Sequence, residues 1–311
     1  MKSKTPLLFV VFLMLLSSCH KEVKSNLALL DYQLPLDSAL VFAKDIVSTE
    51  DFEFAITFSP EMDEVFFTRR KHEGDNEIYS MRLTEDQWST PELAFFSPEQ
   101  GWDFEPHINP AGDRLYFGST RPLSDTSKAS GMHQWVSRKE ANGWTEPEPL
   151  GAPFVDRFTM YISSTENGNL YYTSAEAGAP PQDGGIYYSV LEKNQYSDAQ
   201  RMNEQINAGE WIAHPYIAPD ESYMIYDGER SDGYGDCDLY ISFYKDGSWT
   251  EPVNLGPEVN TEQCEMCSSV SPDGKYLFFH RGVYSEEDRS VGDIYWIDFK
   301  RVLERIKNDS N

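Results

Sequence analysis

The chain has few basic residues, and it has no apolar run long enough to cross a bilayer as a helix. Lys and Arg together number 26 against 52 Asp and Glu among 311 residues, for a formal net charge of −26. A surface this acidic repels phosphate backbones, so we expect no nucleic acid as a partner. Hydrophobic residues make up 40% of the chain, which excludes disorder and provides a sizeable core for one large domain or two small ones.

Several familiar catalytic signatures are also missing. The sequence has no Gly-x-Ser-x-Gly elbow, no His-Glu-x-x-His, no Walker loop and no Gly-x-Gly-x-x-Gly. After the repeats described below are assigned, no segment is left to form a second, catalytic domain. We therefore expect no cofactor and no metal site.

The first residues have the layout of a secretory signal peptide. Lys2 and Lys4 precede the apolar run from Pro6 to Leu16, which is shorter than the roughly 20 residues of a membrane-spanning helix. "LSSC" follows and ends at Cys19. A small-residue cleavage site would explain the serines equally well, but a cysteine directly after them favours a resemblance to the lipobox of bacterial lipoproteins.

This resemblance implies cleavage after residue 18, acylation of Cys19 with chains such as palmitate, and a polar tether over residues 19–38. Several acyl chains on one residue give firm membrane attachment. The Lys-Glu pair behind the cysteine resembles the export signal of Bacteroidetes surface lipoproteins. We expect an outer-membrane lipoprotein that faces the periplasm or the cell surface. Loss of Lys2 and Lys4 would bring the net charge to −28.

An aromatic block recurs along the chain. "VFF", "LYF", "LYY", "MIY" and "LFF" start at residues 65, 115, 170, 224 and 277, so successive blocks lie 50, 55, 54 and 53 residues apart. Five residues before four of these blocks stands a proline that opens a turn such as "SPDG", and Thr165 takes its place in the third. Each unit therefore predicts a hairpin of two strands around this turn.

Two further strands are expected in each unit. The third strands are "EIYSM", "HQWVS", "GIYYS", "DLYIS" and "DIYWI", and the fourth strands start at Trp88, Trp144, Tyr196 and Trp249. Four short strands per unit with hardly any helical periodicity are typical of a β-propeller blade. The fold class is therefore all-β, a five-bladed β-propeller of four-stranded antiparallel blades over residues 39–299.

The last unit lacks a fourth strand of its own and continues into a charged, helix-like tail over residues 300–311. "ALVFAKDIVSTED" (Ala39 to Asp51) precedes the first unit much as Pro252 to Gln263 precedes the fifth. We expect this N-terminal strand to complete the last blade and close the ring, which removes exposed sheet edges. A ring of six blades is the alternative, and it would need another unit within residues 20–50.

The repeats resemble a known family over about residues 39–299. "SVSPDGKYLFF" with "GDIYWID" is similar to the TolB-type, WD40-like propeller repeat; "YIAPDESYMIY" is the next most similar, and the third unit keeps only "ENGNLYY". The family includes periplasmic scaffolds, gating propellers of prolyl-peptidase-like enzymes and many uncharacterised lipoproteins. The resemblance implies the fold and leaves the function open.

Side chains that face the channel are found by counting back from each turn. Five residues before it lie Ala55, Glu105, Met160, His214 and Cys267, and three before it lie Thr57, His107, Ile162, Tyr216 and Ser269. The second and fourth units have a Trp at the rim and a His deeper along the strand. The predicted ligand pocket at the channel mouth consists of Trp102, Asp103, Glu105, His107, Trp211, His214 and Tyr216.

Blander interpretations stay open for these residues. The tryptophans could pack between blades, and the histidines could satisfy backbone groups in the channel. Arginines that follow the aromatic block (Arg69, Arg121, Arg230 and Arg281) are expected to form ion pairs with acids near the third strands (Asp75, Asp236, Asp238 and Asp293).

Three cysteines remain besides Cys19. Cys237 and Cys264 fall at the same ends of their strands, so in an oxidising envelope we expect a disulfide from Cys237 to Cys264 or Cys267, with the third thiol free. "CEMC" has metal or redox spacing, but no second Cys-x-x-Cys accompanies it. A zinc site would have to recruit His214 or Cys237 from another blade.

Taken together, these features favour a lipid-anchored binding or scaffold module over an enzyme, with an envelope protein, peptidoglycan or a glycan as partner. The alternative is a carbohydrate-active enzyme, a glycosidase or lyase working in the channel. Such an enzyme needs two carboxylates about 5 to 10 Å apart. Glu53, Asp103, Glu105 and Glu265 are candidates, although acids are expected everywhere in so acidic a chain.

Overall fold

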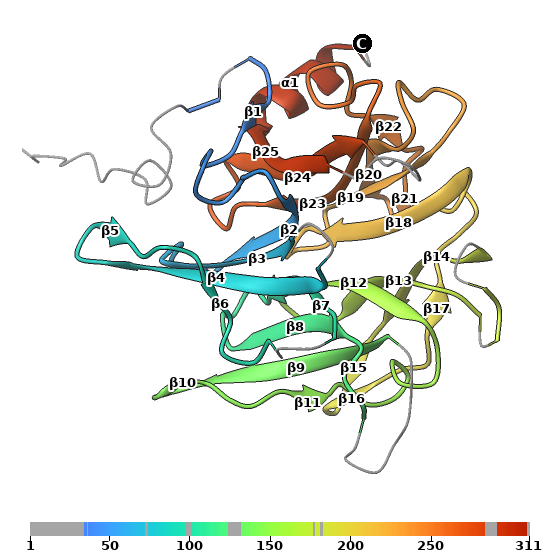
Figure 1. Ribbon diagram of the computed structural model, residues 1–311. Coiled ribbons are helices and arrows are strands. Elements are labelled where there is room, and N and C mark those ends of the chain that lie inside the picture. The colour runs from blue at the N-terminus through green and yellow to red at the C-terminus, as the bar shows by residue number, and fades with distance from the viewer. Residues whose placement is uncertain are drawn as a thin grey trace, which may run out of the picture.

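Five similar antiparallel β-units, called sheets below, follow one another along the chain (Figure 1), and a single parallel strand pair joins the first and the last of them into one nine-stranded sheet. The computed structural model describes residues 34–35, 37–71, 74–97, 101–123, 132–176, 178–180, 183–283 and 291–309. The expected signal peptide, Cys19 and most of the expected tether lie outside the described residues. Among the described residues, no helix has both the length and the apolar character needed to cross a membrane.

Each sheet begins with a hairpin around the turn that the sequence predicts. The first strands are β2 (Phe52–Phe58), β7 (Asp103–Ile108), β12 (Thr159–Ser164), β18 (Glu210–Ile217) and β23 (Cys264–Val270). The second strands are β3 (Glu64–Arg70), β8 (Arg114–Ser119), β13 (Leu170–Ser174), β19 (Tyr223–Glu229) and β24 (Tyr276–Val283). Aromatic and branched residues fill these strands because both faces of each sheet are buried.

The outer strands differ in length. The third strands are β4 (Asn76–Thr84), β9 (His133–Glu140), β14 (Gly185–Ser189), β20 (Asp238–Lys245) and β25 (Val291–Asp298). The short fourth strands are β6 (Glu92–Leu93), β11 (Glu148–Pro149), β17 (Gln200–Arg201) and β22 (Val253–Asn254). The residues predicted to open the fourth strands lie instead in small hairpins just before them: β5 (Gln87–Trp88), β10 (Gly143–Trp144), β15 (Leu191–Glu192) with β16 (Gln195–Tyr196), and β21 (Ser248–Trp249).

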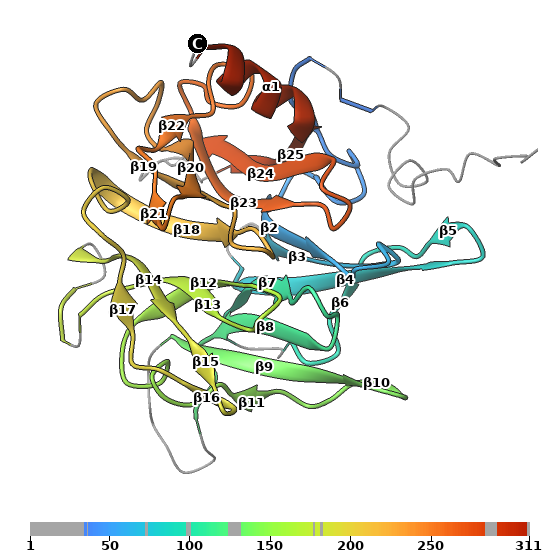
Figure 2. The same cartoon turned by 180° about the vertical axis from the view of Figure 1, so that it is seen from behind.

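The two ends of the chain meet at the last sheet. β1 (Leu40–Val41) pairs antiparallel with β25, with Leu40 opposite Trp296, and the figure shows the blue strand beside the red one (Figure 1). β25 also has one parallel pair with β2, Phe52 opposite Gly292. The helix α1 (Phe299–Asp309) follows β25 directly and lies at the same end of the molecule (Figure 2). Phe299, Val302 and Ile306 bury its apolar face.

Apolar clusters fill the spaces between neighbouring sheets. One joins Phe66 of the first sheet to Phe117 and Trp135 of the second, and another joins Phe42 and Phe58 to residues of the fifth sheet. Three more clusters join the second sheet to the third, the third to the fourth and the fourth to the fifth. The prediction of an all-β, propeller-type fold is confirmed by this repeated packing of antiparallel sheets.

Polar contacts link the first strands to one another near the middle of the molecule. The Thr57 hydroxyl accepts the Ile108 N–H (3.0 Å), and the Ser163 hydroxyl accepts the Ile217 N–H (3.1 Å). From the last repeat back to the first, the Ser269 hydroxyl donates to the Ile56 carbonyl (2.7 Å). These bonds satisfy backbone groups of strands that are too far apart to form a ladder.

Candidate functional site

A β-bulge interrupts the first strand of every repeat. The hydrogen-bonded register shifts at this point in all five strands. The residues at the bulges share a left-handed backbone: Ala55 (φ 51°), Glu105 (56°), Tyr161 (49°), His214 (47°) and Cys267 (54°). Such a conformation is uncommon for residues other than glycine, and here it recurs because each bulge redirects one side chain out of the alternation of its strand.

The third repeat is out of step with the prediction. Counting back five and three residues from the turn predicts that Met160 and Ile162 face the channel. This prediction is wrong by one residue. The bulge falls at Tyr161, and Ser163 pairs with Tyr171 where Thr57 pairs with Phe66 in the first repeat.

The cause is a shorter turn. In the third repeat the closing bond joins the Thr165 N–H to the Asn169 carbonyl, whereas in the first it joins the Ser59 N–H to the Glu64 carbonyl, one residue further along. A slip of one residue moves every side chain to the other face of a strand. The loss of proline from this turn is the sequence signal that could have revealed the shift.

Three of the bulge side chains meet in the interior. Glu105, His214 and Cys267 each offer one ligand atom, and these atoms lie within 4.8 Å of one another. His214 Nε2 is 3.6 Å from Glu105 Oε1. On the other side of the imidazole, His214 Nδ1 lies 2.9 Å from Asp227 Oδ2. We call Glu105, His214, Asp227 and Cys267 the central cluster.

The carboxylates of the central cluster also hold the backbone of the bulges. Glu105 Oε2 accepts the Tyr161 N–H (2.7 Å), and Asp227 Oδ1 accepts the Cys267 N–H (3.1 Å). In two other repeats, a threonine hydroxyl of the preceding sheet accepts the equivalent N–H: Thr68 accepts the Glu105 N–H (2.9 Å), and Thr173 accepts the His214 N–H (2.8 Å).

Gly118 explains why Glu105 has this second task. It occupies the position in β8 that Thr68 occupies in β3 and Asp227 in β19, opposite the residue before the bulge. A Cβ atom there would lie 2.9 Å from the Phe104 ring, so no side chain fits. Without an acceptor on β8, the N–H of the next bulge is left to the Glu105 carboxylate.

Burial governs the protonation of the central cluster. Desolvation raises the pKa of Glu105 to about 7, although His214 and the Tyr161 N–H oppose the shift. Burial also lowers the pKa of His214, but Asp227 and Cys267 more than offset this and hold it well above its ordinary value. Desolvation raises the pKa of Cys267 to about 12, so its sulfur is a thiol. The two carboxyls on either side of His214 therefore favour the charged form of its imidazole.

The other predicted pocket residues are distributed along the strands. Asp103 is fully buried and forms an ion pair with Arg121 (2.5 Å). Equivalent pairs join Arg69 to Glu53 and Arg281 to Glu265, each at 2.8 Å. The expected ion pairs therefore form at three of the four arginines, but with acids of the first strands rather than of the third.

Arg230 differs because the fourth repeat has no acid at that position of its first strand. Its Nη1 donates to the Ala208 carbonyl (2.9 Å). Asp75, one of the acids expected to pair with an arginine, instead accepts a hydrogen bond from Trp102 Nε1 (2.8 Å).

Both predicted rim tryptophans are on the surface, where the first strands begin. Trp102 is 39% exposed, and its ring is held by Asp75. Trp211 is 59% exposed and has a left-handed backbone with φ 52°. A second register shift of β18, between Glu210 and Ala213, accompanies this conformation, and the exposure of Trp211 means that no core packing requires it.

His107 and Tyr216 lie toward the opposite end of the first strands. With Thr57, Ser164 and Ser269 they line a cavity of about 220 Å³ among the prolines of the turns. His107 Nε2 accepts the Ser164 N–H (3.0 Å), and burial lowers the pKa of His107 to about 3. The seven predicted residues therefore occupy three regions along the first strands: the start, the bulge and the end near the turn. Among them, Glu105 and His214 come within 3.6 Å of each other, and His107 and Tyr216 line one cavity.

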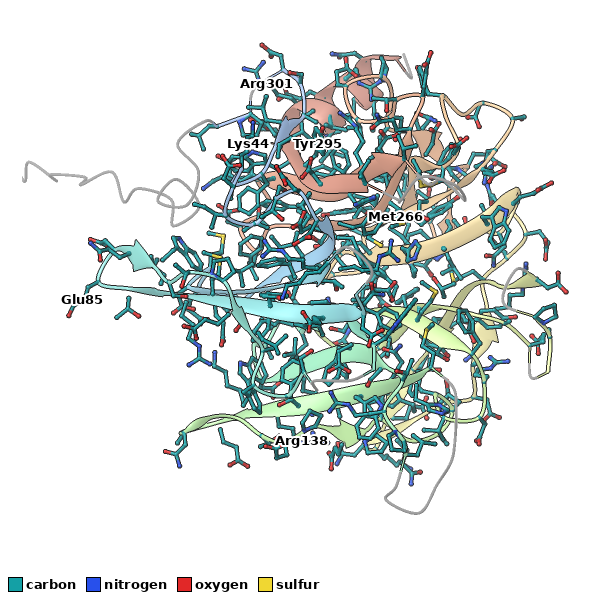
Figure 3. The ribbon with its side chains drawn as sticks, in the orientation of Figure 1. Lys44, Glu85, Arg138, Met266, Tyr295 and Arg301 are labelled. Carbon is teal, nitrogen blue, oxygen red and sulfur yellow. A yellow bond between two sulfur atoms is a disulfide. The ribbon has the colours of Figure 1, made fainter. Side chains whose placement is uncertain are left out.

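Two residues of this interior were missed in the sequence. Asp227 lies three residues after the start of the fourth aromatic block, where the first and third repeats have Thr68 and Thr173. An acid at a position of small hydroxyl side chains was the available signal. Tyr161 was missed because of the shifted turn. Figure 3 shows Met266, the neighbour of Cys267, toward the middle of the molecule, whereas Glu85 and Arg138 lie at its edge.

The cysteines resolve the pairing that the sequence left open. Cys237 and Cys264 form a disulfide with Cα atoms 4.5 Å apart, and Cys267 is a buried free thiol. The Glu265 N–H also donates to the Cys237 carbonyl (2.8 Å), so the fourth and fifth sheets are joined at this point.

A buried histidine beside this interior predicts acid sensitivity. His280 is fully buried, its Nδ1 donates to the Glu53 carbonyl (2.7 Å), and desolvation lowers its pKa from 6.5 to about 4. The unfolded chain takes up this proton below about pH 6.5 and the folded chain only near pH 4. His280 therefore stabilises the fold fully above about pH 6.5, and up to about 3 kcal/mol is lost as the pH falls to about 4.

The His280→Asn variant keeps a donor for the Glu53 carbonyl and removes the titration. We expect its free energy of unfolding to fall less than that of the unmodified chain between about pH 7 and about pH 4. Denaturant titrations at both pH values measure the difference. Equal losses in the two proteins would contradict the assignment of acid sensitivity to His280.

No protein-family model matches the chain. No curated protein matches it. Solved structures with a similar arrangement include TolB from Acinetobacter baumannii, with 14% identity, coverage of 79% of this chain and 54% of that chain, and a TM-score of 0.48. The chain thus spans about half of that TolB chain.

Two further similar structures are glycoside-active proteins by name. The GH43 endo-arabinanase from Bacillus licheniformis has 14% identity, with 82% of this chain and 94% of that chain covered and a TM-score of 0.49. The xylan β-1,4-xylosidase from Bacillus halodurans C-125 has 11% identity, with 80% and 53% covered and a TM-score of 0.47. Likenesses this distant do not assign the chain to a family.

Proposed function

We propose that the chain is a lipid-anchored, five-bladed β-propeller of the bacterial envelope that binds a glycan without transforming it. The five-blade count is supported by the five hairpin repeats and by an apolar cluster between each pair of successive sheets. Closure of the ring is supported by β1 on β25, by the bond from Ser269 to Ile56, and by the cluster that joins Phe42 and Phe58 to the fifth sheet.

The lipid anchor rests on the sequence. Residues 1–18 have the order of a signal peptide, and Cys19 follows directly. Acylation of Cys19 would tether the propeller to the outer membrane through residues 19–38, on its periplasmic face or at the cell surface. Metabolic labelling with a fatty-acid analogue tests this: the label should be lost in Cys19→Ser and kept in Cys267→Ser.

The binding role rests on one contrast between the two kinds of side chain in the predicted pocket. The groups able to do acid–base or nucleophilic chemistry are buried and already paired with each other. The two tryptophans, by contrast, are exposed at the ends of their strands, and the side chain of Trp102 is already oriented by Asp75. A fixed, exposed aromatic ring is a ready surface for the apolar face of a sugar, and ordering it beforehand lowers the entropic cost of binding.

The net charge of the chain limits the classes of ligand that it can bind. With a net charge of −26, the surface disfavours polyanions and accepts neutral or cationic partners. A neutral glycan or the glycan strand of peptidoglycan meets this requirement. An envelope protein docked on the same tryptophans is the other partner that the test below distinguishes.

Binding is tested with the full chain in mild detergent against neutral glycans and muropeptides. We expect saturable binding without product, and a loss of affinity of about 10- to 30-fold in Trp102→Ala or Trp211→Ala, as for an aromatic anchor. Tyr244→Ala is the matched control. Tyr244 is 47% exposed, between the values of the two tryptophans, but it lies near the end of its strand rather than at the start. Equal affinity in all three variants would contradict the proposed site.

A carbohydrate-active enzyme is the second candidate. The observation that favours it is the pair of carboxyls, Glu105 and Asp227, on either side of His214. The same panel discriminates: glycan cleavage that disappears in Glu105→Gln would replace the binding proposal with an enzymatic one. If no glycan binds, chemical crosslinking in the envelope before and after the tryptophan substitutions tests the protein partner.

A further inference from the structure

We propose that Glu105, His214 and Cys267 form a binding site for a transition-metal ion of the Zn²⁺ type. The three residues are the bulge residues of the second, fourth and fifth repeats, and the left-handed backbone turns each of them toward the same interior point. This site is independent of the proposed glycan binding, which uses the exposed tryptophans.

The distances are close to those of a metal centre. Ligands about 2.0 to 2.3 Å from a tetrahedral Zn²⁺ ion lie about 3.3 to 3.8 Å from one another. Glu105 Oε1 and His214 Nε2 are already 3.6 Å apart, and the three ligand atoms are all within 4.8 Å. Small side-chain adjustments would therefore bring all three atoms onto one ion.

Each of the three ligands is held by a second contact. Both carboxylate oxygens of Asp227 lie within 3.0 Å of His214 Nδ1, which leaves Nε2 facing the cluster. A carboxylate on the far nitrogen of a ligating histidine is the usual support of such sites. Asp227 also accepts the Cys267 N–H, and the Tyr161 N–H holds Glu105 Oε2, so Oε1 is the oxygen left toward His214.

The donor set favours one class of metal. One neutral imidazole, one carboxylate and one thiolate suit Zn²⁺ and similar borderline ions, whereas Mg²⁺ and Ca²⁺ require oxygen donors. Binding would therefore release the Cys267 thiol proton and the second imidazole proton of His214 to solvent. The two remaining bulge positions add no ligand: Ala55 has no donor atom, and the Tyr161 hydroxyl donates to the Ser268 carbonyl (2.6 Å). Three protein ligands would leave a fourth position for water.

The cysteine spacing in the sequence pointed to a different set. "CEMC" suggests that Cys264 and Cys267 act together, but Cys264 is in the disulfide with Cys237. Cys267 is thus the one free thiol among the described cysteines, and its partners come from other repeats. The sequence predicted no metal site because the possible partners of the cysteines lie in other repeats. The proposal replaces that prediction, because the structure brings such partners together.

Metal binding is tested on the full chain after treatment with a chelator. Competition with a chromophoric chelator should give one Zn²⁺ per chain, and Co²⁺ should give a thiolate-to-cobalt charge-transfer band. We expect Cys267→Ser and His214→Ala to weaken Zn²⁺ binding by more than about 100-fold, and Asp227→Asn by about 10- to 100-fold as a supporting residue. Circular dichroism checks that each variant is folded.

His107→Gln is the matched control, because His107 is a partly buried histidine of the interior that lies two residues beyond Glu105, nearer the turn end of β7. It should bind Zn²⁺ with unchanged affinity. Absence of stoichiometric binding, equal affinity in Cys267→Ser, or a Co²⁺ complex without the thiolate band would overturn the proposal. If the His214 and Cys267 variants do not fold, the cobalt spectrum of the unmodified chain and the Asp227→Asn affinity still decide.

Discussion

Replacing Phe42 with alanine is expected to lower the free energy of unfolding by about 3 to 5 kcal/mol, the usual cost of removing a buried phenylalanine. Phe42 is fully buried although it belongs to the N-terminal segment. Its ring meets those of Phe278 and Trp296 edge to face, at centroid distances of 5.0 and 5.1 Å, and that of Phe58 at 6.2 Å. It therefore joins the segment to both the last and the first sheet.

The backbone around Phe42 makes the same connection. The Phe42 N–H donates to the Ile294 carbonyl (2.8 Å), and the Ser48 hydroxyl donates to the same carbonyl (3.2 Å). If this segment closes the propeller, loss of the Phe42 phenyl group should also speed hydrogen exchange of the β25 amides opposite β1. Exchange in the second and third sheets should change much less, because their apolar clusters do not include Phe42.

Denaturant titration measures the stability change, and Phe95→Ala serves as the control. Phe95 is 56% exposed, so its removal should cost well under 1 kcal/mol. An effect of Phe42→Ala no larger than that of the control would show that the N-terminal segment does not close the structure. The proposal of a ring completed by both chain ends would then be wrong.

The repeat made much of this architecture predictable from the sequence. Turn chemistry and the aromatic blocks fixed the first three strands of each unit, because proline, aspartate and glycine have few alternatives at such turns. The fourth strands were misjudged at Trp88 and its equivalents, since a tryptophan in a small hairpin and one in an outer strand have the same local pattern. The connection between the chain ends was suggested by the missing strand of the last unit.

The interior was only partly predictable. Counting from the turn brought Glu105, His214 and Cys267 to one level, because repeats place equivalent residues around a common centre. The same count failed at Tyr161, where one residue is missing from the turn. Asp227 comes from a second strand, and no spacing along the first strands could reveal it. Which acid pairs with which arginine also depends on side-chain reach rather than on sequence position.

Replacing Asp227 with alanine is expected to destabilise the chelator-treated protein by about 3 to 5 kcal/mol, because it strands a buried charge. The His214 imidazole lies 2.9 Å from this carboxylate, and Asp227 is 3% exposed. Without Asp227, the remaining carboxylate of the central cluster is Glu105 at 3.6 Å, which must also hold the Tyr161 N–H. The Cys267 N–H loses its acceptor as well, and an unsatisfied buried donor adds to the cost.

A double-mutant cycle separates these two contributions. If the stranded charge dominates, adding His214→Gln to Asp227→Ala should recover part of the lost stability, with a coupling energy above about 1 kcal/mol. If the orphaned N–H dominates, the second substitution should only add to the loss. Asp236→Ala is the matched control, since Asp236 is an exposed acid of the same repeat. A loss in Asp227→Ala no greater than in this control would mean that the central cluster does not support the fold, and that its carboxylates are free to serve a ligand instead.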